Sequence, residues 1–537
     1  MSELHPHYVT TPRGQVRLWL SGSGPNLVAI AGLTTAASVL ARRLAETCPG
    51  WRAIVVELPG VGGSSEAAAD TGDNADTVDN AAAAVAGALT WLGKEPFVLV
   101  GFDLSCPVAD RVRAALAASG PARTVFVSAQ TAADWAKAGT DPGNLDPRQD
   151  GTHLQALWAF LRDRHLLKSA NPGLPATEGE PLPDDRTLSE TFVAAAVRPH
   201  RFASLWRASA SAMRCTVGAG ATNVAYTADL PRALAGLSVP AGSAVPPKTA
   251  AGPEGAIWHD YVETRNGRMH LRRSGDKGRP LLVIPTGGGS SAQFAPVVTG
   301  LANGRQVFAV DYLGNGLSDK PAGKVSIETL ADDMLALLDA LGFDDVDVLG
   351  SHTGALVALE LAVIAPERVG RLVMEGPVFI SQDFQDDLLA NYFPVIEPDK
   401  WGLHLTLVWN WRRDLFMFWP WYRVDRTAAR ELGVPTADEL HKYAVGILES
   451  GSTYGGAYRS AFFYDTRARM PKLTRPGLVC AGPDDMLKDG LTDARRLGPD
   501  GLVTVSETPT TVWWPDPEPV AAAETLAMYD AFLEAAS

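Results

Sequence analysis

The chain of 537 residues is long enough for two or three domains, and its 46% hydrophobic and 20% charged residues are typical of a globular protein. A net charge of −14 at pH 7 disfavours nucleic acid and anionic membranes as partners, because both attract basic surfaces. The sequence contains no apolar run long enough to span a membrane, no signal-peptide pattern at its start and no CxxC pair. We therefore expect a cytoplasmic protein that binds neither nucleic acid nor membrane.

Early segments of the chain recur in the same order further along it. The first pair begins at Tyr8 and at Tyr261, 253 positions later, and shares a Thr, a Gly, a Leu and a Ser-Gly. Three further pairs follow, namely NLVAIAG at 26–32 with LLVIPTG at 281–287, IVVELPGVGGSS at 54–65 with VFAVDYLGNGLSD at 307–319, and FVLVGFDLS at 97–105 with VDVLGSHTG at 346–354. Chance does not readily produce such matches in one order, so the sequence predicts a tandem duplication.

Each copy alternates apolar strands with helical patterns, which is typical of an α/β fold with a mostly parallel sheet. Between the copies the sequence is rich in Pro, Gly and Ala and has no apolar period, so it predicts a linker at 241–256. The first domain is then 1–240 and the second 257–537. The first copy is the shorter, because the linker begins where a late strand is due at 229–242. We expect its last two strands to be missing.

The motifs of the second copy resemble those of the α/β-hydrolase superfamily over about 257–537. DYLGNGLSD at 311–319 resembles the D-x-P-G-x-G-x-S-D segment of that superfamily, and GSHTG at 350–354 lies where its nucleophile elbow G-x-S-x-G occurs. The first copy resembles the same superfamily more faintly. The resemblance implies two tandem α/β-hydrolase units, the first truncated, with a cap inserted in the second at about 380–465.

Neither elbow carries the serine nucleophile of the superfamily. The apex is His352 in GSHTG and Asp103 in GFDLS, and both residue types tolerate the positive φ that an elbow requires. His352 could act as a general base or as a nucleophile, or remain only as a turn former. Asp103 could attack carbon, as the resemblance to haloalkane dehalogenases and epoxide hydrolases implies, or be a turn residue of a decayed unit.

Two acidic positions match places where the superfamily carries its catalytic acid. Asp484, or its neighbour Asp485, follows a late strand, and Glu375 follows the strand before it. We expect either Glu375 or Asp484 to orient the imidazole of His352, with a slight preference for Glu375.

The superfamily places its catalytic histidine before the last helix, here near 508–519. No histidine follows His441 in the sequence, and Trp513 and Trp514 stand in that region instead. A Ser–His–Asp relay is therefore not available in the usual topology. We expect a rearranged site in which the elbow histidine is the only base.

The backbone amide that follows the apex belongs to Thr353, and a second amide is expected from Gly287 or Gly288. The resemblance implies that these amides form an oxyanion hole, which would stabilise negative charge on a substrate oxygen.

The predicted cap is rich in aromatic residues, which could line a pocket for an apolar or aromatic small molecule or could pack the cap onto the core. They are Trp401, Trp409, Trp411, Phe416, Phe418, Trp419, Trp421 and Tyr422.

We expect an enzyme that hydrolyses an ester, lactone, thioester or C–C bond without a metal or organic cofactor. The alternatives are a cofactor-free lyase or cyclase, and an inactive pseudohydrolase that binds a ligand or a partner.

Overall fold

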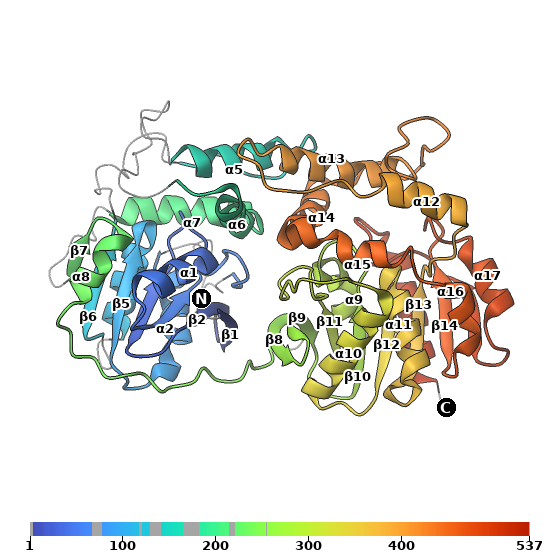
Figure 1. The fold of residues 1–537 in the computed structure, drawn as a ribbon, viewed down its shortest axis with the longest axis horizontal. Coiled ribbons are helices and arrows are strands. Elements are labelled where there is room, and N and C mark those ends of the chain that lie inside the picture. Colours follow the sequence, from blue (N-terminus) through green and yellow to red (C-terminus); the bar gives the residue numbers. More distant parts are fainter. Residues whose placement is uncertain are drawn as a thin grey trace. The chain divides into compact units, whose positions relative to one another are not determined.

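The computed structural model describes residues 4–66, 78–116, 121–128, 141–164, 182–213, 221–253 and 255–535 (Figure 1). The chain divides into two compact units. Unit 1 comprises Met1–Ala250 with Pro398–Leu403, and unit 2 comprises Ala251–Glu397 with His404–Ser537. Each unit contains a mostly parallel β-sheet flanked by helices, so the predicted α/β class is confirmed.

The sheet of unit 1 has seven strands in the order β1-β2-β4-β3-β5-β6-β7. The strands are β1 His5–Thr11, β2 Gly14–Ser21, β3 Asn26–Ile30, β4 Arg52–Val56, β5 Phe97–Phe102, β6 Arg123–Val127 and β7 Ala221–Val224. The described helices are α1 Ala37–Thr47, α2 Val78–Ala88, α3 Cys106–Ala115, α5 Thr152–Asp163, α6 Asp185–Ala196, α7 Pro199–Ala212 and α8 Leu230–Leu234. Every residue of β3 and β5 is buried, because helices cover both faces of the sheet, and this explains their unbroken apolar sequences.

The prediction that unit 1 lacks its last two strands is wrong, because one of the two is present as β7. β7 pairs in parallel with β6 at the edge of the sheet, with Thr124 opposite Ala221 and Val127 opposite Val224. It precedes the segment 229–242 in which the sequence suggested a strand, and α8 begins that segment. The four residues of β7 are partly exposed and include no apolar run, so their sequence gives no strand signal.

The predicted linker contains no helix or strand among its described residues, yet its first part is held against unit 1; Glu254 lies outside the described residues. Ser243 donates from its amide and its hydroxyl to Oε1 of Glu95, at 2.9 and 2.7 Å. These bonds lower the pKa of Glu95 to about 2, the hydroxyl of Ser243 being the largest cause. Nη1 of Arg52 also donates to the carbonyl of Ala244 at 2.7 Å. Residues 241–250 therefore belong structurally to unit 1.

The sheet of unit 2 has eight strands in the order β15-β14-β13-β12-β10-β11-β9-β8. The strands are β8 Trp258–Thr264, β9 Gly267–Ser274, β10 Arg279–Ile284, β11 Arg305–Val310, β12 Val346–Ser351, β13 Val369–Glu375, β14 Gly477–Ala481 and β15 Val503–Glu507. The helices are α9 Ala295–Gly300, α10 Ile327–Leu341, α11 Thr353–Ile364, α12 Gln382–Asn391, α13 Leu403–Met417, α14 Ala437–Ser450, α15 Gly455–Ser460, α16 Thr466–Arg469, α17 Gly490–Leu497 and α18 Pro519–Glu534. Helices α12 to α15 lie between β13 and β14 in the chain and gather at one end of this sheet (Figure 1).

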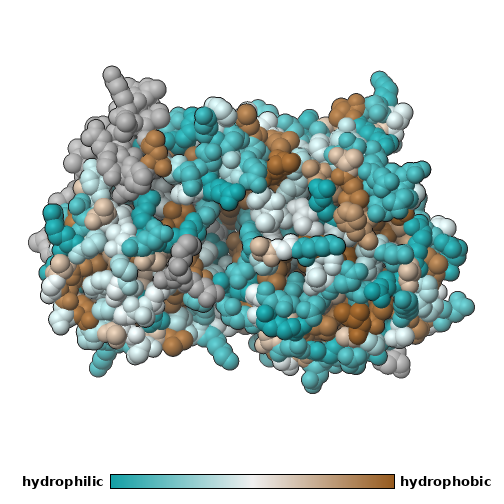
Figure 2. All heavy atoms as spheres, in the orientation of Figure 1, coloured by the Kyte–Doolittle hydropathy of each residue, from teal (hydrophilic) through white to brown (hydrophobic). Residues whose placement is uncertain are grey.

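Hydrophilic residues cover most of the face of the molecule in Figure 2, and apolar residues form small separate areas on it. The exposed large apolar side chains come from separate parts of the sequence, for example Ile364, Val395, Val424 and Phe463. Single exposures of this kind are ordinary on protein surfaces. Among the described residues, no helix combines the length and the apolar character that a bilayer crossing requires.

Candidate active site

The elbow of unit 2 is a strained turn between β12 and α11. His352 has φ +50°, as the sequence predicted, and precedes the first residue of α11. A Cβ atom at Gly350 would lie 2.1 Å from the carbonyl oxygen of Gly354, and one at Gly354 would lie 2.0 Å from that of Ile284. Only glycine fits at either position, so the backbone holds the histidine at a fixed point above the sheet.

The imidazole of His352 is paired with a buried carboxylate. Its Nε2 lies 3.0 Å from Oδ2 of Asp485, in the turn after β14, and His352 is 7% exposed. The other carboxylate oxygen of Asp485 accepts from the amide of Leu487 at 2.8 Å. This hydrogen bond with Asp485 assigns the proton to Nε2 in the neutral imidazole and leaves the lone pair on Nδ1. Nδ1 makes no hydrogen bond to any described residue.

Burial and pairing act in opposite directions on this pair. Burial lowers the pKa of His352, but the charge and hydrogen bond of Asp485 outweigh it, so the pKa of His352 is raised. Burial raises the pKa of Asp485, but the charge and hydrogen bond of His352 outweigh it, so the pKa of Asp485 is lowered. The pair thus favours a protonated imidazole beside an ionised carboxylate.

The acid that contacts His352 is not Asp484, which the sequence favoured over its neighbour, but that neighbour, Asp485. Asp484 is exposed, and its carboxylate makes no hydrogen bond to a described residue; only its backbone oxygen accepts a bond, from Arg430 at 2.6 Å. Asp485, the alternative from the sequence, contacts the imidazole instead. Adjacent side chains in the Gly-Pro-Asp-Asp turn point in different directions, so the sequence alone could not choose between them.

The carboxylate of Glu375, the other expected acid, makes no hydrogen bond to the imidazole of His352; it binds a tryptophan beside that ring, and its charge raises the pKa of His352. Its Oε2 accepts a hydrogen bond of 2.6 Å from Nε1 of Trp513, and its Oε1 accepts one of 2.7 Å from the hydroxyl of Tyr529. Burial raises the pKa of Glu375. The indole of Trp513 meets the imidazole of His352 edge-on, with the ring centroids 5.3 Å apart. Trp513 thus lies against the imidazole in the region where the superfamily has its histidine.

The expected oxyanion residues lie together beside the elbow. A Cβ atom at Gly287 would lie 2.6 Å from Oγ1 of Thr353 and 2.5 Å from Cα of Tyr458. The ring of Tyr458 similarly covers Gly288, which lines the same pocket as His352. The glycines are therefore required for this close packing of loop, helix start and cap.

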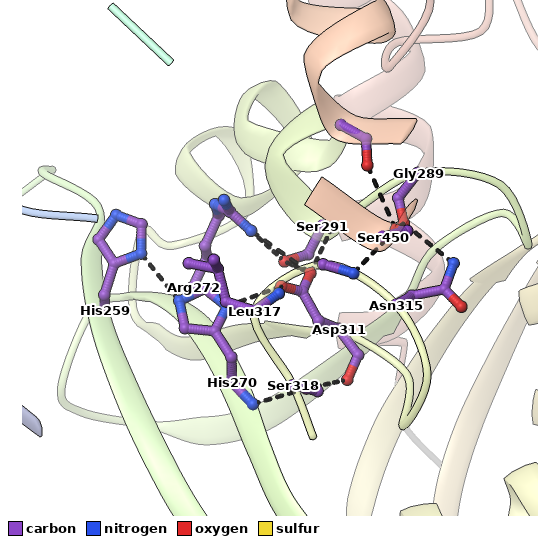
Figure 3. Close-up of polar contacts among 12 residues, drawn as sticks. His259, His270, Arg272, Gly289, Ser291, Asp311, Asn315, Leu317, Ser318 and Ser450 are labelled. Atoms are coloured by element: carbon purple, nitrogen blue, oxygen red, sulfur yellow. Dashed lines mark hydrogen bonds and ion pairs between the residues drawn. The ribbon is translucent and has the colours of Figure 1, made fainter. Parts of the chain in front are cut away.

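A buried ion cluster anchors the loop at 285–291 that carries these glycines (Figure 3). The amide and the hydroxyl of Ser291 both donate to Oδ1 of Asp311, each at 2.6 Å. Oδ2 of Asp311 lies 2.8 Å from Nδ1 of His270, and Oδ1 lies 3.4 Å from Nη1 of Arg272. Although burial raises the pKa of Asp311, His270 and Arg272 outweigh it and hold that pKa well below its usual range. The Asp311 carboxylate is therefore ionised and fixes one end of the loop.

Asn315 holds the middle of the same loop. It is 1% exposed, and its Nδ2 donates to the carbonyl oxygens of Gly287 and Gly289, at 3.0 and 3.1 Å (Figure 3). The hydroxyl of Ser450, at the end of α14, also donates to the carbonyl of Gly289, at 3.3 Å. The glycine carbonyls are thus occupied by these donors.

A small pocket opens beside His352 between the elbow and the cap. Six aromatic side chains and two arginines contribute to its lining, namely Tyr392, Phe416, Tyr443, Tyr458, Trp513, Trp514, Arg412 and Arg430. The cavity volume is about 40 Å³, room for about three or four waters at about 10–15 Å³ each. A larger substrate therefore has to displace side chains of the cap.

Of the two roles expected for the cap aromatics, lining the pocket applies to Phe416 alone of the eight residues named from the sequence. Trp409 and Trp411 are buried within the cap, at 1% each, and Trp401 is 60% exposed. The three lining tyrosines and the two arginines were missed. The cap has no motif that separates pocket residues from packing residues, and only the folded arrangement brings them together.

The elbow of unit 1 holds Asp103 at the equivalent point, after β5, with φ +44°. Oδ2 of Asp103 accepts a hydrogen bond of 2.7 Å from Thr34 and lies 3.8 Å from Nη2 of Arg164. No histidine contacts its carboxylate in the described part of the chain. Within the described ranges, Asp103 therefore has no histidine placed to act as the base that a second step of covalent catalysis requires.

The described residues include no group of three or more His, Cys, Asp or Glu side chains arranged to hold a metal ion.

Comparisons with known proteins identify the family of the chain. The family model "alpha/beta hydrolase fold" matches residues 279–397. The RutD protein of Azorhizobium caulinodans is 38% identical over 234 residues, which are 41% of this chain and 81% of that protein. The carboxylesterase YbfK of Bacillus subtilis is 32% identical over 208 residues, 35% of this chain and 68% of the esterase. A 2-hydroxymuconate semialdehyde hydrolase of Pseudomonas putida is 39% identical over 157 residues, 28% of this chain and 51% of that enzyme. Given the matching family model and the coverage of the first two relatives, this chain belongs to the α/β-hydrolase family.

Proposed function

We propose that unit 2 is a hydrolase in which His352 is the general base and Asp485 orients it. The observation that carries the proposal is the 3.0 Å contact between Nε2 of His352 and Oδ2 of Asp485 beside a small pocket. A carboxylate that fixes the tautomer and the plane of an imidazole leaves one nitrogen free to accept a proton. An inactive binding protein has no need of this pairing, so the buried acid favours an enzyme.

The reaction proceeds by direct attack of water on a carbonyl carbon. Nδ1 of His352 accepts a proton from water while the water oxygen bonds to the carbonyl carbon. The carbonyl oxygen becomes an oxyanion, which the amides of Thr353 and Gly288 stabilise. When the intermediate collapses, the bond to the leaving group breaks and the imidazolium returns the proton to that group. The sequence of steps requires no serine.

The substrate class is a small apolar or aromatic compound with an ester, lactone, thioester or activated C–C bond. The aromatic lining of the pocket favours such a compound. The relatives support the reaction type, since one is named a carboxylesterase and another a semialdehyde hydrolase.

We further propose that the two units arose by tandem duplication, and matching polar contacts support this. In unit 1, the amide of Arg17 donates to Oγ of Ser64 at 2.9 Å, and Ser64 donates to the backbone oxygen of Glu57 at 3.1 Å. The side chain of Arg17 pairs with that of Glu57 at 2.8 Å.

In unit 2, the amide of His270 donates to Oγ of Ser318 at 2.8 Å, and Ser318 donates to the backbone oxygen of Asp311 at 2.7 Å. The side chain of His270 pairs with that of Asp311 at 2.8 Å. The three positions correspond one to one with those of unit 1, although the residue types differ at two of them. On this proposal unit 1 is a non-catalytic copy.

The test begins with a screen of aromatic and aliphatic esters, lactones and thioesters for turnover by the full chain. With the best substrate, His352→Ala and Asp485→Asn are expected to lower kcat by about 10²–10⁴-fold and about 10–10²-fold. Asp484→Asn is the matched control, because its carboxylate lies outside the contact. Unchanged turnover in His352→Ala would refute the proposal.

A further inference from the structure

The pocket beside His352 contains a buried cation without an anionic partner. Arg412, on α13, is 4% exposed and lines the pocket. Its guanidinium makes no ion pair or hydrogen bond to any described residue, and its Nε is enclosed without an acceptor. Its described contacts are with rings, since its Cζ lies 4.8 Å from the ring centroid of Tyr443 and 5.4 Å from that of Trp411.

The other arginine of the pocket is compensated. Arg430 donates to the backbone oxygens of Leu415 and Asp484, at 3.0 and 2.6 Å. The charges of Asp485 and Asp484 also act on it and oppose the lowering of its pKa by burial. The buried carboxylate of Asp485 is in turn committed to His352. Neither aspartate lines the pocket itself, and the charge of Asp485 acts on His352 and Arg430.

The side chains around Arg412 are neutral phenols. Its charge acts on Tyr392, Tyr443, Tyr454 and Tyr458, and burial raises the pKa of each. Ring faces stabilise a guanidinium only weakly in comparison with a carboxylate. Guanidinium groups stay protonated at physiological pH, and a buried charge without a counterion destabilises the fold. A ligand that brings an anion into the pocket would remove this penalty.

We propose that the substrate carries a carboxylate, which Arg412 binds. The inference rests on the proposed hydrolase function, whose substrate class it narrows to a small carboxylic acid with an apolar or aromatic body. A guanidinium matches a carboxylate through two parallel N–H···O bonds, so it fixes orientation as well as charge. Because Arg412 and His352 line the same small pocket, the carboxylate lies close to the bond that is hydrolysed.

The experiment measures binding, so it does not depend on turnover. Acetate, benzoate and phenylacetate are compared with acetamide, benzamide and phenylacetamide, by calorimetry and by the quenching of tryptophan fluorescence. The wild-type chain is expected to bind at least one acid about 10-fold or more tightly than its amide. Arg412→Gln is expected to weaken binding of that acid by about 10–100-fold and to leave binding of the amide unchanged. The affinity of Arg412→Lys for that acid is expected to lie between the affinities of the wild-type chain and of Arg412→Gln.

Two further variants locate the anion. Arg413→Gln is the matched control, because the neighbouring Arg413 is 37% exposed and pairs with Asp414. It should bind the acids like wild type. In His352→Ala the acid should still bind; loss of binding there would place the anion on a protonated imidazole and overturn the proposal. Equal affinity of acid and amide for wild type, or no effect of Arg412→Gln in a variant with wild-type thermal unfolding, would also overturn it. Loss of turnover in His352→Ala tests the hydrolase separately.

Discussion

Trp513 donates a hydrogen bond of 2.6 Å from Nε1 to Oε2 of Glu375, and the indole held in this way meets the imidazole of His352 edge-on. A buried carboxyl thus holds the ring that packs against the elbow histidine, and its charge raises the pKa of that histidine. The superfamily position for a histidine is filled here by a residue that packs against the base and cannot itself transfer a proton.

Replacement of Glu375 should reveal how much this bond stabilises the fold. Glu375→Leu leaves the N–H of Trp513 and the O–H of Tyr529 without an acceptor, at a cost of about 1–3 kcal/mol for each group. We expect the free energy of unfolding to fall by about 2–5 kcal/mol, measured by urea unfolding. Glu375→Gln retains an acceptor oxygen and should lose about 1 kcal/mol or less. Equal stability of the Leu and Gln variants would contradict this assignment.

The pH dependence of turnover should report the His352–Asp485 pair. A general base must be neutral, and the pKa of His352 is raised by its partner. We therefore expect kcat/KM to increase with pH through one ionisation above the usual histidine value of about 6.5. In Asp485→Asn the charge is removed while burial remains, so the midpoint should move to lower pH. A midpoint that does not move would show that Asp485 does not act on the base.

The sequence predicted the parts of this fold that depend on local patterns. Apolar runs predicted the central strands, and the elbow motifs GFDLS and GSHTG, whose apex residues tolerate positive φ, predicted the positive φ of Asp103 and His352. Unbroken apolar strands and obligatory glycines each have one physical cause, so they can be identified in a single sequence.

The parts that were missed depend on tertiary context. Which of two adjacent aspartates faces His352 is decided by the path of one turn. Arg412 lies in an aromatic-rich helix whose hydrophobic pattern does not distinguish pocket from core. A short edge strand such as β7 is stabilised by pairing with β6, and its own four residues carry no signal.

Loss of the Asn315 clamp should affect catalysis more than binding. Asn315→Ala releases the carbonyls of Gly287 and Gly289 and loosens the loop that is expected to supply an oxyanion amide. We expect kcat to fall by about 10–100-fold while KM changes by a few-fold, measured by steady-state kinetics. Asn391→Ala is the control, because this exposed side chain bonds to no described residue other than Asp387. An increase in KM at constant kcat would instead assign Asn315 to substrate binding.

Asp103 in unit 1 should be dispensable for turnover. Thr34 donates to its carboxylate, and Asn can accept the same bond; because Asp103→Asn also removes the charge 3.8 Å from Nη2 of the buried Arg164, thermal unfolding is measured alongside turnover. We expect activity within a few-fold of wild type in the same assay. A loss of about 10²-fold or more with unchanged thermal unfolding would move the active site to unit 1.

Gly376 offers the most specific test of the His352–Asp485 contact. It follows β13 with φ +57°, and a Cβ atom there would lie 2.5 Å from Cδ2 of His352 and 2.7 Å from Oδ2 of Asp485. Gly376→Ala should therefore force the imidazole and the carboxylate apart. We expect kcat to fall by about 10–10³-fold and the pH midpoint to decrease, as in Asp485→Asn.

Gly304→Ala separates this effect from backbone strain. Gly304 has φ +73°, and a Cβ atom there would have nothing within 4 Å. Both alanine variants carry the penalty of a positive φ, about 1–2 kcal/mol of stability, whereas only Gly376→Ala adds a clash with the catalytic pair. The two variants should therefore have similar unfolding temperatures, whereas the turnover of Gly376→Ala should be much lower than that of Gly304→Ala. If both variants keep full turnover and the same pH profile, the contact between His352 and Asp485 does not determine the rate, and the base must be sought elsewhere in the pocket.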